Sequence, residues 1–102
     1  MNSTLYLAGP ITGVDNYHEA FKQAQDILEA RGYRVINPAP LDHMVPPDAP
    51  WDDFINICLG LIDMADAVIL LPGWSKSRGA CLEYGYAYAK GKVTMTLEDF
   101  LK

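Results

Sequence analysis

Residues 67–71, with the sequence AVILL, constrain the fold of this chain more than any other stretch. Five consecutive apolar residues leave no face of a strand for water, which is the pattern of a strand that is buried on both faces. Such strands occur almost only in parallel sheets, because helices cover both sides of those sheets. This stretch therefore predicts a protein of the α/β class.

Strands and helices are predicted to alternate along the rest of the chain. Short apolar stretches indicate further strands at residues 5–8, 33–36 and 93–95. Apolar residues at helical spacing indicate helices after residue 16, over 51–64 and over 77–90, whereas 96–101 suits a short helix or an arm. A length of 102 residues is that of a single domain, spanning 1–102. The alternation predicts a three-layer fold with a parallel sheet of about four to five strands and flanking helices.

The predicted helices carry recognisable end signals. Asn16 with Glu19 three residues later resembles a capping box at the start of the first helix. Ser77 is suited to cap the third helix. Gly32 and Gly91 follow the first and third helices, where a glycine commonly ends a helix.

Ligands bind beyond the carboxyl ends of the strands in sheets of this kind. The loops that leave those ends are residues 9–16, 37–50 and 72–77. The second loop is long and rich in proline, and long loops in small domains are usually functional or mobile. We therefore expect the site where the three loops meet. Asp42 and His43, on the second loop, either reach this site as a lid or are solvated loop residues.

Glu83 is the one charged residue between Gly79 and Ala89, in a segment of small and aromatic residues. One interpretation is an exposed helix glutamate that pairs with Arg78 or Lys76, since exposed charges are the norm. The other is a carboxylate at a ligand site, because the loop before it leaves the end of a buried strand. The nearby helix start favours the ionised form of Glu83.

Composition limits the classes of partner. A net charge of −5 and a pI of about 4.7 argue against a nucleic-acid polymer as ligand. Cys58 and Cys81 stand singly inside predicted helices, as free buried thiols that fit a reducing cytoplasm. His18 and His43 are far apart in sequence, so we expect no metal and no cofactor. We also expect no membrane segment and no signal peptide.

Three motifs carry a resemblance that covers residues 5–94. They are YLAGPI at residues 6–11, ADAVILLPG at 65–73, and the spaced pattern S-x-G-A-x-x-E-x-G-x-A from 77 to 87. Together they resemble the nucleoside 2-deoxyribosyltransferase superfamily, and most of all its small phage and bacterial branch of unknown function. The 2′-deoxynucleoside 5′-monophosphate N-glycosidases belong to the same superfamily. The resemblance implies a flavodoxin- or Rossmann-like fold.

The resemblance also implies roles for particular residues. Glu83 matches the nucleophile that attacks the anomeric carbon of the sugar, and Tyr6 matches the tyrosine that hydrogen-bonds it. Ser77 matches a serine that helps to bind a 5′-phosphate in the N-glycosidases, where the transferases commonly have aspartate. The remaining residues expected to bind substrate lie in the same loops: Gly9, Pro10, Ile11, Gly73, Trp74, Arg78 and Gly79. Trp74 either stacks on a nucleobase or covers the edge of the core.

The sequence departs from the superfamily at two places. The phosphate-binding arginine after the first strand is missing, and Lys76 or Arg78 is a possible replacement from another loop. The acid that protonates the leaving base is replaced by Cys58, whose thiol is a poor proton donor at neutral pH. A weaker likeness, from Pro72-Gly73 to Glu83, is to the nucleoside-monophosphate phosphoribohydrolases. Both likenesses point to N-glycosidic chemistry on nucleotides.

These observations support three hypotheses. The first is hydrolysis or transfer at the N-glycosidic bond of a (deoxy)nucleoside or its 5′-monophosphate, with Glu83 as nucleophile. The second is a binding module of the same fold that senses or sequesters such a ligand without turnover. The third is a structural accessory protein. Broad apolar faces on the second and third predicted helices further predict a homodimer or larger homo-oligomer.

Overall fold

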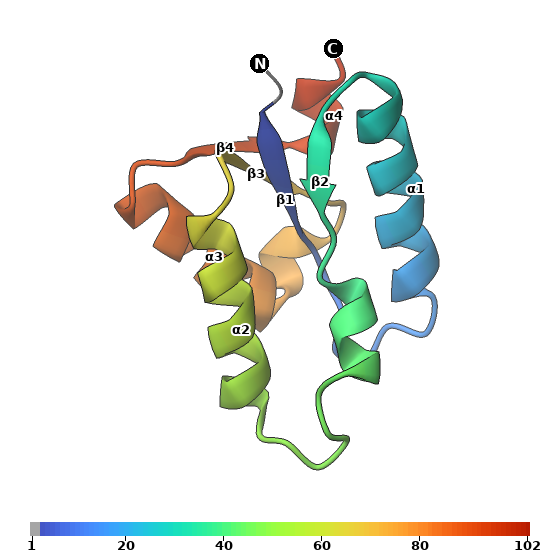
Figure 1. Ribbon diagram of the computed structural model, residues 1–102, viewed down its shortest axis with the longest axis vertical. Helices are drawn as coiled ribbons and strands as arrows, with labels where there is room; N and C mark the ends of the chain where they lie inside the picture. Colours follow the sequence, from blue (N-terminus) through green and yellow to red (C-terminus); the bar gives the residue numbers. More distant parts are fainter. Residues whose placement is uncertain (1–2) are drawn as a thin grey trace.

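The computed structural model describes residues 3–102 and contains one sheet of four parallel strands. The strands are β1 (Thr4–Ala8), β2 (Arg34–Ile36), β3 (Ala67–Leu70) and β4 (Val93–Thr96). Their order across the sheet is β2-β1-β3-β4, so β1 and β3 are the central pair (Figure 1). In register, Leu5 of β1 lies opposite Val35 of β2 and Ala67 of β3. The predicted α/β class and parallel sheet are confirmed.

Helices cover both faces of the sheet (Figure 1). The α-helices are α1 (Tyr17–Ala30), α2 (Trp51–Asp63), α3 (Arg78–Ala89) and α4 (Leu97–Phe100). Two short 3₁₀ helices, η1 (Ala39–His43) and η2 (Trp74–Lys76), lie within the second and third predicted loops. The segment that suited a short helix or an arm is therefore a helix. Part of the proline-rich loop is also ordered as a turn of helix.

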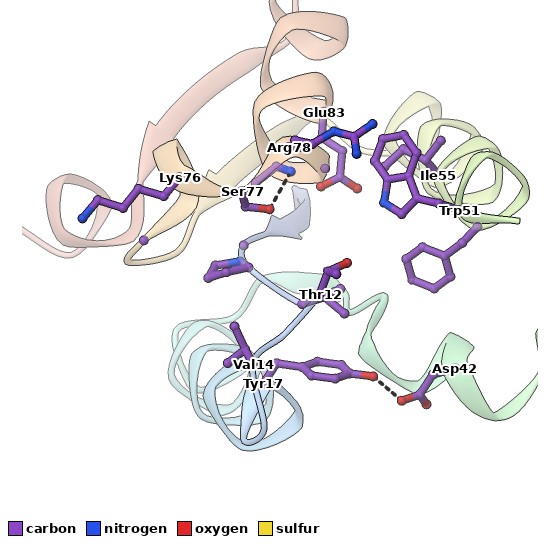
Figure 2. Close-up of a pocket in the computed structure, with 17 residues that line it drawn as sticks. Thr12, Val14, Tyr17, Asp42, Trp51, Ile55, Lys76, Ser77, Arg78 and Glu83 are labelled. Carbon is purple, nitrogen blue, oxygen red and sulfur yellow. Dashed lines mark hydrogen bonds between the residues drawn. The ribbon is translucent and has the colours of Figure 1, made fainter. Parts of the chain in front are cut away.

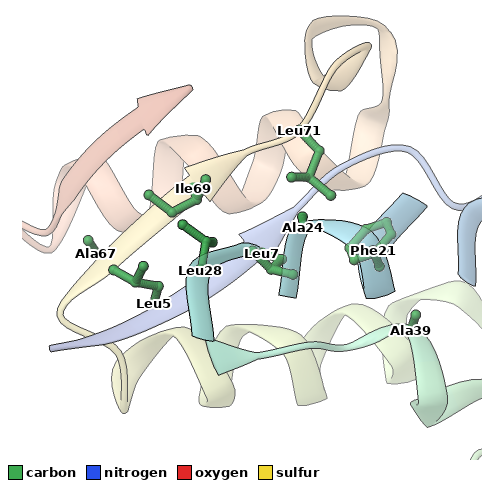
Figure 3. Close-up of a cluster of buried hydrophobic side chains, with 9 residues drawn as sticks. All are labelled: Leu5, Leu7, Phe21, Ala24, Leu28, Ala39, Ala67, Ile69 and Leu71. Atoms are coloured by element: carbon green, nitrogen blue, oxygen red, sulfur yellow. The ribbon is translucent and has the colours of Figure 1, made fainter. Parts of the chain in front are cut away.

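The first face of the sheet packs against α1 and α4. Leu5 and Leu7 of β1 point to this face, where they meet Phe21 and Leu28 of α1 (Figure 3). Ile69 of β3 joins the same cluster, because side chains alternate between the two faces of a strand. The whole buried cluster is Leu5, Leu7, Phe21, Ala24, Leu28, Ala39, Ala67, Ile69 and Leu71.

The opposite face packs against α2 and α3. Tyr6 of β1 and Val68 of β3 point to this face, where they meet Cys58 and Ile62 of α2 and Ala87 of α3. Each central strand thus contributes alternate residues to two separate cores, as the run at residues 67–71 predicted. A sheet covered on both faces gives the expected three layers.

Helix capping agrees with the sequence at one helix and differs at another. The Ser77 hydroxyl accepts a hydrogen bond from the Ala80 N–H at 3.2 Å and caps α3, as predicted. The capping box at Asn16 is wrong, because the Asn16 side chain makes no cap hydrogen bond. Its backbone, at φ −106° and ψ 28°, lacks the extended conformation from which an N-cap side chain reaches the first turn. The Asn16 carbonyl accepts from the Ala20 N–H instead.

The two cysteines are both free, but only Cys58 is buried. Cys81 is exposed on α3, which corrects the expectation of two buried thiols. It lies on the outer side of the helix, with its sulfur 3.4 Å from the Ser75 carbonyl oxygen. None of the helices in residues 3–102 has the length and apolar character needed to cross a membrane.

Two neighbouring residues of α1 provide a test of the core. Leu28 is fully buried in the first cluster, whereas Ile27 is 43% exposed. Leu28→Ala should lower the free energy of unfolding by about 2–5 kcal/mol, because it removes buried methyl groups and leaves a cavity. Ile27→Ala should change it by no more than about 0.5 kcal/mol. Urea denaturation followed by circular dichroism measures both, and equal effects would contradict the packing described for α1.

Candidate functional site

A cavity of about 760 Å³ lies beyond the carboxyl ends of β1 and β3. Its walls come from the loop after β1, the loop after β3 with the start of α3, and the start of α2 (Figure 2). The volume lies within the range of small-molecule sites. The order in which strands are added to the sheet reverses here. The chain leaves β1 through α1 on one face and reaches β3 through α2 on the other. Such switch points are where α/β sheets bind ligands.

Glu83 of α3 lies at the floor of this cavity. Its side chain points into the cavity from the first turns of the helix, yet the residue is only 5% exposed. The hydroxyl of Tyr6, which is fully buried on β1, donates a hydrogen bond to Glu83 Oε2. β1 and α3 therefore fix the carboxylate from two directions. Glu83 is therefore not an exposed helix glutamate, and it borders the cavity, where its role at a ligand site stays a prediction.

Burial dominates the electrostatics of Glu83. It raises the pKa of the carboxyl to about 7, against smaller opposing contributions from hydrogen bonds with Tyr6 and Cys58. Burial likewise raises the pKa of the Cys58 thiol to about 12 and that of Tyr6 well above its usual value. The helix start was expected to favour ionised Glu83, but desolvation of the second turn outweighs it. Near neutral pH the site thus holds a carboxyl that can either keep or lose its proton.

Cationic and polar groups occupy the side of the cavity formed by the start of α3. The Ser77 hydroxyl caps the helix and also lines the cavity. Arg78 lies with its guanidinium carbon 4.7 Å from the centre of the Trp51 ring, a cation–π contact between α3 and α2. Lys76 lines the cavity from η2. This side is suited to an anionic group, because the N–H groups of the helix start border the cavity together with Arg78.

The other walls are mostly apolar. Trp51, Phe54 and Ile55 of α2 line one side, and Val14 and Tyr17 lie across the cavity from them (Figure 2). Aromatic side chains supply broad flat surfaces on which a planar ring can stack. A ligand with both a ring and an anionic group would therefore match the two kinds of wall.

Most of the predicted site residues meet at this cavity. Eight of them line it: Gly9, Pro10, Ile11, Gly73, Ser77, Arg78, Gly79 and Glu83. Tyr6 lies beneath Glu83 rather than in the wall. Trp74 is not among the lining residues and packs on Tyr84, with ring centres 5.1 Å apart. Of the two interpretations of Trp74, the structure therefore places it at the edge of the core.

At two loop positions around the cavity, the local structure explains why the residue is glycine. A Cβ at Gly9 would lie 3.0 Å from the Cβ of Leu71, so close packing of β1 against β3 requires glycine there. Gly73 has φ +85°, a left-handed conformation that side chains rarely adopt. Gly9 thus lines the cavity and also packs closely against Leu71.

Sequence reasoning missed the α2 wall and the neighbourhood of Asp42. Trp51 and Phe54 were interpreted only as the apolar face of a helix, although their position directly after Pro50 places them at the loop end of that helix. Asp42 lines the cavity, which favours the lid interpretation over a purely solvated loop. His18 and His43, expected to be apart, have ring centres 5.6 Å apart. No local pattern signals this, because the fold brings α1 and η1 together.

Asp66 has a structural role at the start of the sheet. It precedes β3, and its carboxylate accepts a hydrogen bond from the Thr4 N–H at 2.8 Å. The Asp66 N–H also donates to the Thr4 carbonyl oxygen at 2.8 Å. These bonds tie the starts of β1 and β3 at the end of the sheet opposite the cavity. Asp66 thus contributes to strand register and not to the site.

The pKa of Glu83 predicts a pH-dependent stability. The folded value of about 7 exceeds the ordinary 4.5, so the folded protein holds this proton more tightly than the unfolded chain. The resulting stability is complete below pH 4.5 and is lost as the pH rises through 7. Glu83→Gln keeps the shape and removes the titration. As the pH rises from 4.5 to 7, wild type should therefore lose on the order of 3 kcal/mol of its free energy of unfolding that Glu83→Gln keeps.

Urea denaturation of both proteins from pH 4 to pH 8 measures this difference. Glu29→Gln, at an exposed carboxylate of α1, is the matched control and should follow wild type at every pH. A Glu83→Gln difference that stays flat across the range would contradict a pKa of Glu83 that burial raises.

Comparison with known proteins bears on the fold and the family of the chain. Among solved structures, the chain is similar to 2-desoxiribosyltransferase from Leishmania mexicana, with a TM-score of 0.71 and 24% identity. The match covers 92% of this chain and 63% of that one, and it confirms the fold that the sequence resemblance implied. No curated protein matches. The model of the family described as a domain of unknown function, DUF4406, matches residues 3–96, and the chain therefore belongs to the DUF4406 family.

Proposed function

We propose that this protein acts at the N-glycosidic bond of a (deoxy)nucleoside or its 5′-monophosphate, by hydrolysis or by transfer, with Glu83 as nucleophile. One observation carries the proposal: a nearly buried carboxylate, held by Tyr6, faces a ligand-sized cavity at the switch point of the sheet. The fold shared with a 2-desoxiribosyltransferase supports glycosyl transfer as the general class.

The arrangement of Glu83 suits nucleophilic displacement at a sugar carbon. Tyr6 bonds Oε2, which leaves Oε1 to attack the anomeric carbon. The carbon–nitrogen bond breaks, and its electron pair leaves with the base as a glycosyl ester forms on Glu83. Water then releases the sugar, or a second base accepts it. A carboxylate that is fixed and poorly hydrated needs little reorganisation before attack.

The two kinds of wall match the two ends of such a ligand. The aromatic surface of Trp51 and Phe54 suits a nucleobase. The start of α3, with Ser77 and Arg78, suits a 5′-phosphate or a sugar hydroxyl. Arg78 and Lys76 both line the cavity and supply the positive charge that is missing after β1.

Within the part of the chain that the structure describes, the cavity lacks a good proton donor for the leaving base, and this favours a second candidate function. In residues 3–102, only Glu83 and Asp42 bring a carboxylate to the cavity wall. A hydrogen bond from Tyr17 holds the pKa of Asp42 below its usual value, and burial raises that of Cys58 to about 12. Neither group is a good proton donor near neutral pH. This supports, as the alternative, a module that binds a nucleotide without turning it over.

Chromatography of a panel of nucleosides and 5′-monophosphates tests the enzymatic proposal through the release of free base. Glu83→Gln should lower activity by about 10³-fold or more, while Glu29→Gln should leave it unchanged. The wild-type kcat/KM should rise about tenfold per pH unit below 7 and level off above it, because only ionised Glu83 attacks. Activity that survives Glu83→Gln undiminished would exclude the mechanism.

Calorimetry with the same panel separates the two candidates. Binding together with base release supports the enzyme. Binding of a nucleotide without base release supports the module, and Arg78→Ala should then weaken binding of a monophosphate more than binding of its nucleoside. The absence of binding and of base release for every member of the panel excludes both.

We also propose that the protein is a homodimer that associates through the outer faces of α2 and α3. These helices pack against each other and carry exposed large apolar side chains at Ile57, Leu82 and Tyr88, and Met64 directly after α2 is exposed as well. Gly85 of α3 has nothing within 4 Å of the position of a Cβ, so a second chain can approach closely there. An apolar surface that extends over two adjacent helices is typical of an interface.

Light scattering over a concentration series tests the assembly. The expected mass is twice the chain mass of 11.3 kDa. Leu82→Lys, at a residue that is 44% exposed, should shift the protein towards monomer, because it places a charge in the apolar surface. Ile27→Lys, at a 43% exposed residue on the opposite side of the sheet, is the control and should not change the mass. A wild-type monomer at every concentration would contradict the proposal.

A further inference from the structure

Three side chains that can bind a metal converge at the rim of the cavity. They are His18 from α1, and Asp42 and His43 from η1, and one ligand atom from each lies within 4.8 Å of the others. His18 Nε2 is 2.6 Å from Asp42 Oδ2, and His43 Nε2 is 3.5 Å from Asp42 Oδ1. Asp42 therefore lies between the two imidazoles and uses a different oxygen towards each.

We propose that His18, Asp42 and His43 form a binding site for one divalent ion of the zinc class. Two imidazole nitrogens and one carboxylate oxygen are a donor set that suits zinc and its neighbours among the transition metals. Ligand atoms around a tetrahedral zinc lie about 3.4 Å apart, given bonds of about 2.0–2.2 Å. The two distances to Asp42 oxygens, 2.6 and 3.5 Å, and the limit of 4.8 Å between all three donor atoms lie around this value, so side-chain rotations can bring the three atoms to one ion.

The surroundings of the cluster support ligand binding by holding the donors in place. The Tyr17 hydroxyl donates a hydrogen bond to Asp42 Oδ2, in the way that outer partners orient metal-binding carboxylates. The Tyr17 ring stacks on that of His18, with centres 4.3 Å apart. Tyr17, which lines the cavity, thus restricts the orientation of both Asp42 and His18.

The exposure of the cluster leaves room for a fourth ligand. The side chains of His18 and Asp42 are 43% and 37% exposed, and that of His43 is 79% exposed. Three protein ligands with one open position are the arrangement of zinc sites that also bind water or another molecule. Since Asp42 lines the cavity, the open position lies at the cavity entrance.

Bound metal would change the rim in two ways. It would join η1 to α1, two segments that are held together at this point by side-chain hydrogen bonds. It would also add two positive charges beside the Asp42 carboxylate. An acidic entrance would thereby become attractive to an anion.

Isothermal titration calorimetry of the untagged protein with zinc chloride at pH 7.5 tests the proposal. One zinc ion should bind per chain, and His18→Ala and His43→Ala should each weaken the affinity by about tenfold or more. Asp48→Asn changes an exposed carboxylate in the same loop and should leave the affinity within about twofold of wild type. Replacing zinc with cobalt(II) should give the visible absorption bands of a tetrahedral ion, and His18→Ala should abolish them.

Several outcomes would overturn the proposal. They are a lack of saturable zinc binding at micromolar protein, a stoichiometry that His18→Ala and His43→Ala leave intact with unchanged affinity, and loss of binding in Asp48→Asn as well. Circular dichroism spectra that match wild type show that each variant is folded. The readout does not depend on catalysis, so this proposal and the proposed function can fail independently.

Discussion

The burial of β1 and β3 on both faces is the constraint on which the rest of the structure depends. Side chains of these two strands alternate between two cores, one under α1 and one under α2 and α3. Helices must therefore lie on both sides of the sheet, and the chain must change sides between β2 and β3. That change opens the space at the carboxyl ends of the central strands, so the cavity is a consequence of how the sheet is covered.

The same packing accounts for the unusual state of Glu83. Tyr6 belongs to β1 and its ring fills the second core, which brings its hydroxyl up against the carboxylate of α3. The hydrogen bond from Tyr6 offsets part of the desolvation of Glu83, but the pKa of Glu83 remains well above that of an exposed glutamate. At neutral pH the free energy of unfolding is thus lower than it would be with an apolar residue at position 83. Sites that keep such groups usually have a chemical use for them.

The sequence was most informative where local pattern and global packing agree. The run AVILL predicted a doubly covered strand, and the lone Glu83 in an apolar helix pointed to the cavity. It was least informative where distant segments meet. Trp51 lines the cavity because the start of α2 lies against the start of α3, and His18 meets His43 only because α1 and η1 lie together. Periodicity describes which face of a helix is apolar, but not which end of that helix borders a cavity.

The cap at Ser77 has a consequence for how this fold can diversify. Serine, threonine, aspartate and asparagine all accept a hydrogen bond from the first turn of a helix, and each stabilises the helix start by about 1 kcal/mol relative to alanine. They differ in charge, and the side chain at this position borders the cavity. A lineage can therefore exchange a neutral group for a negative one at position 77 while α3 keeps its cap. The ligand preference of this side of the cavity can therefore change during evolution without a loss of protein stability.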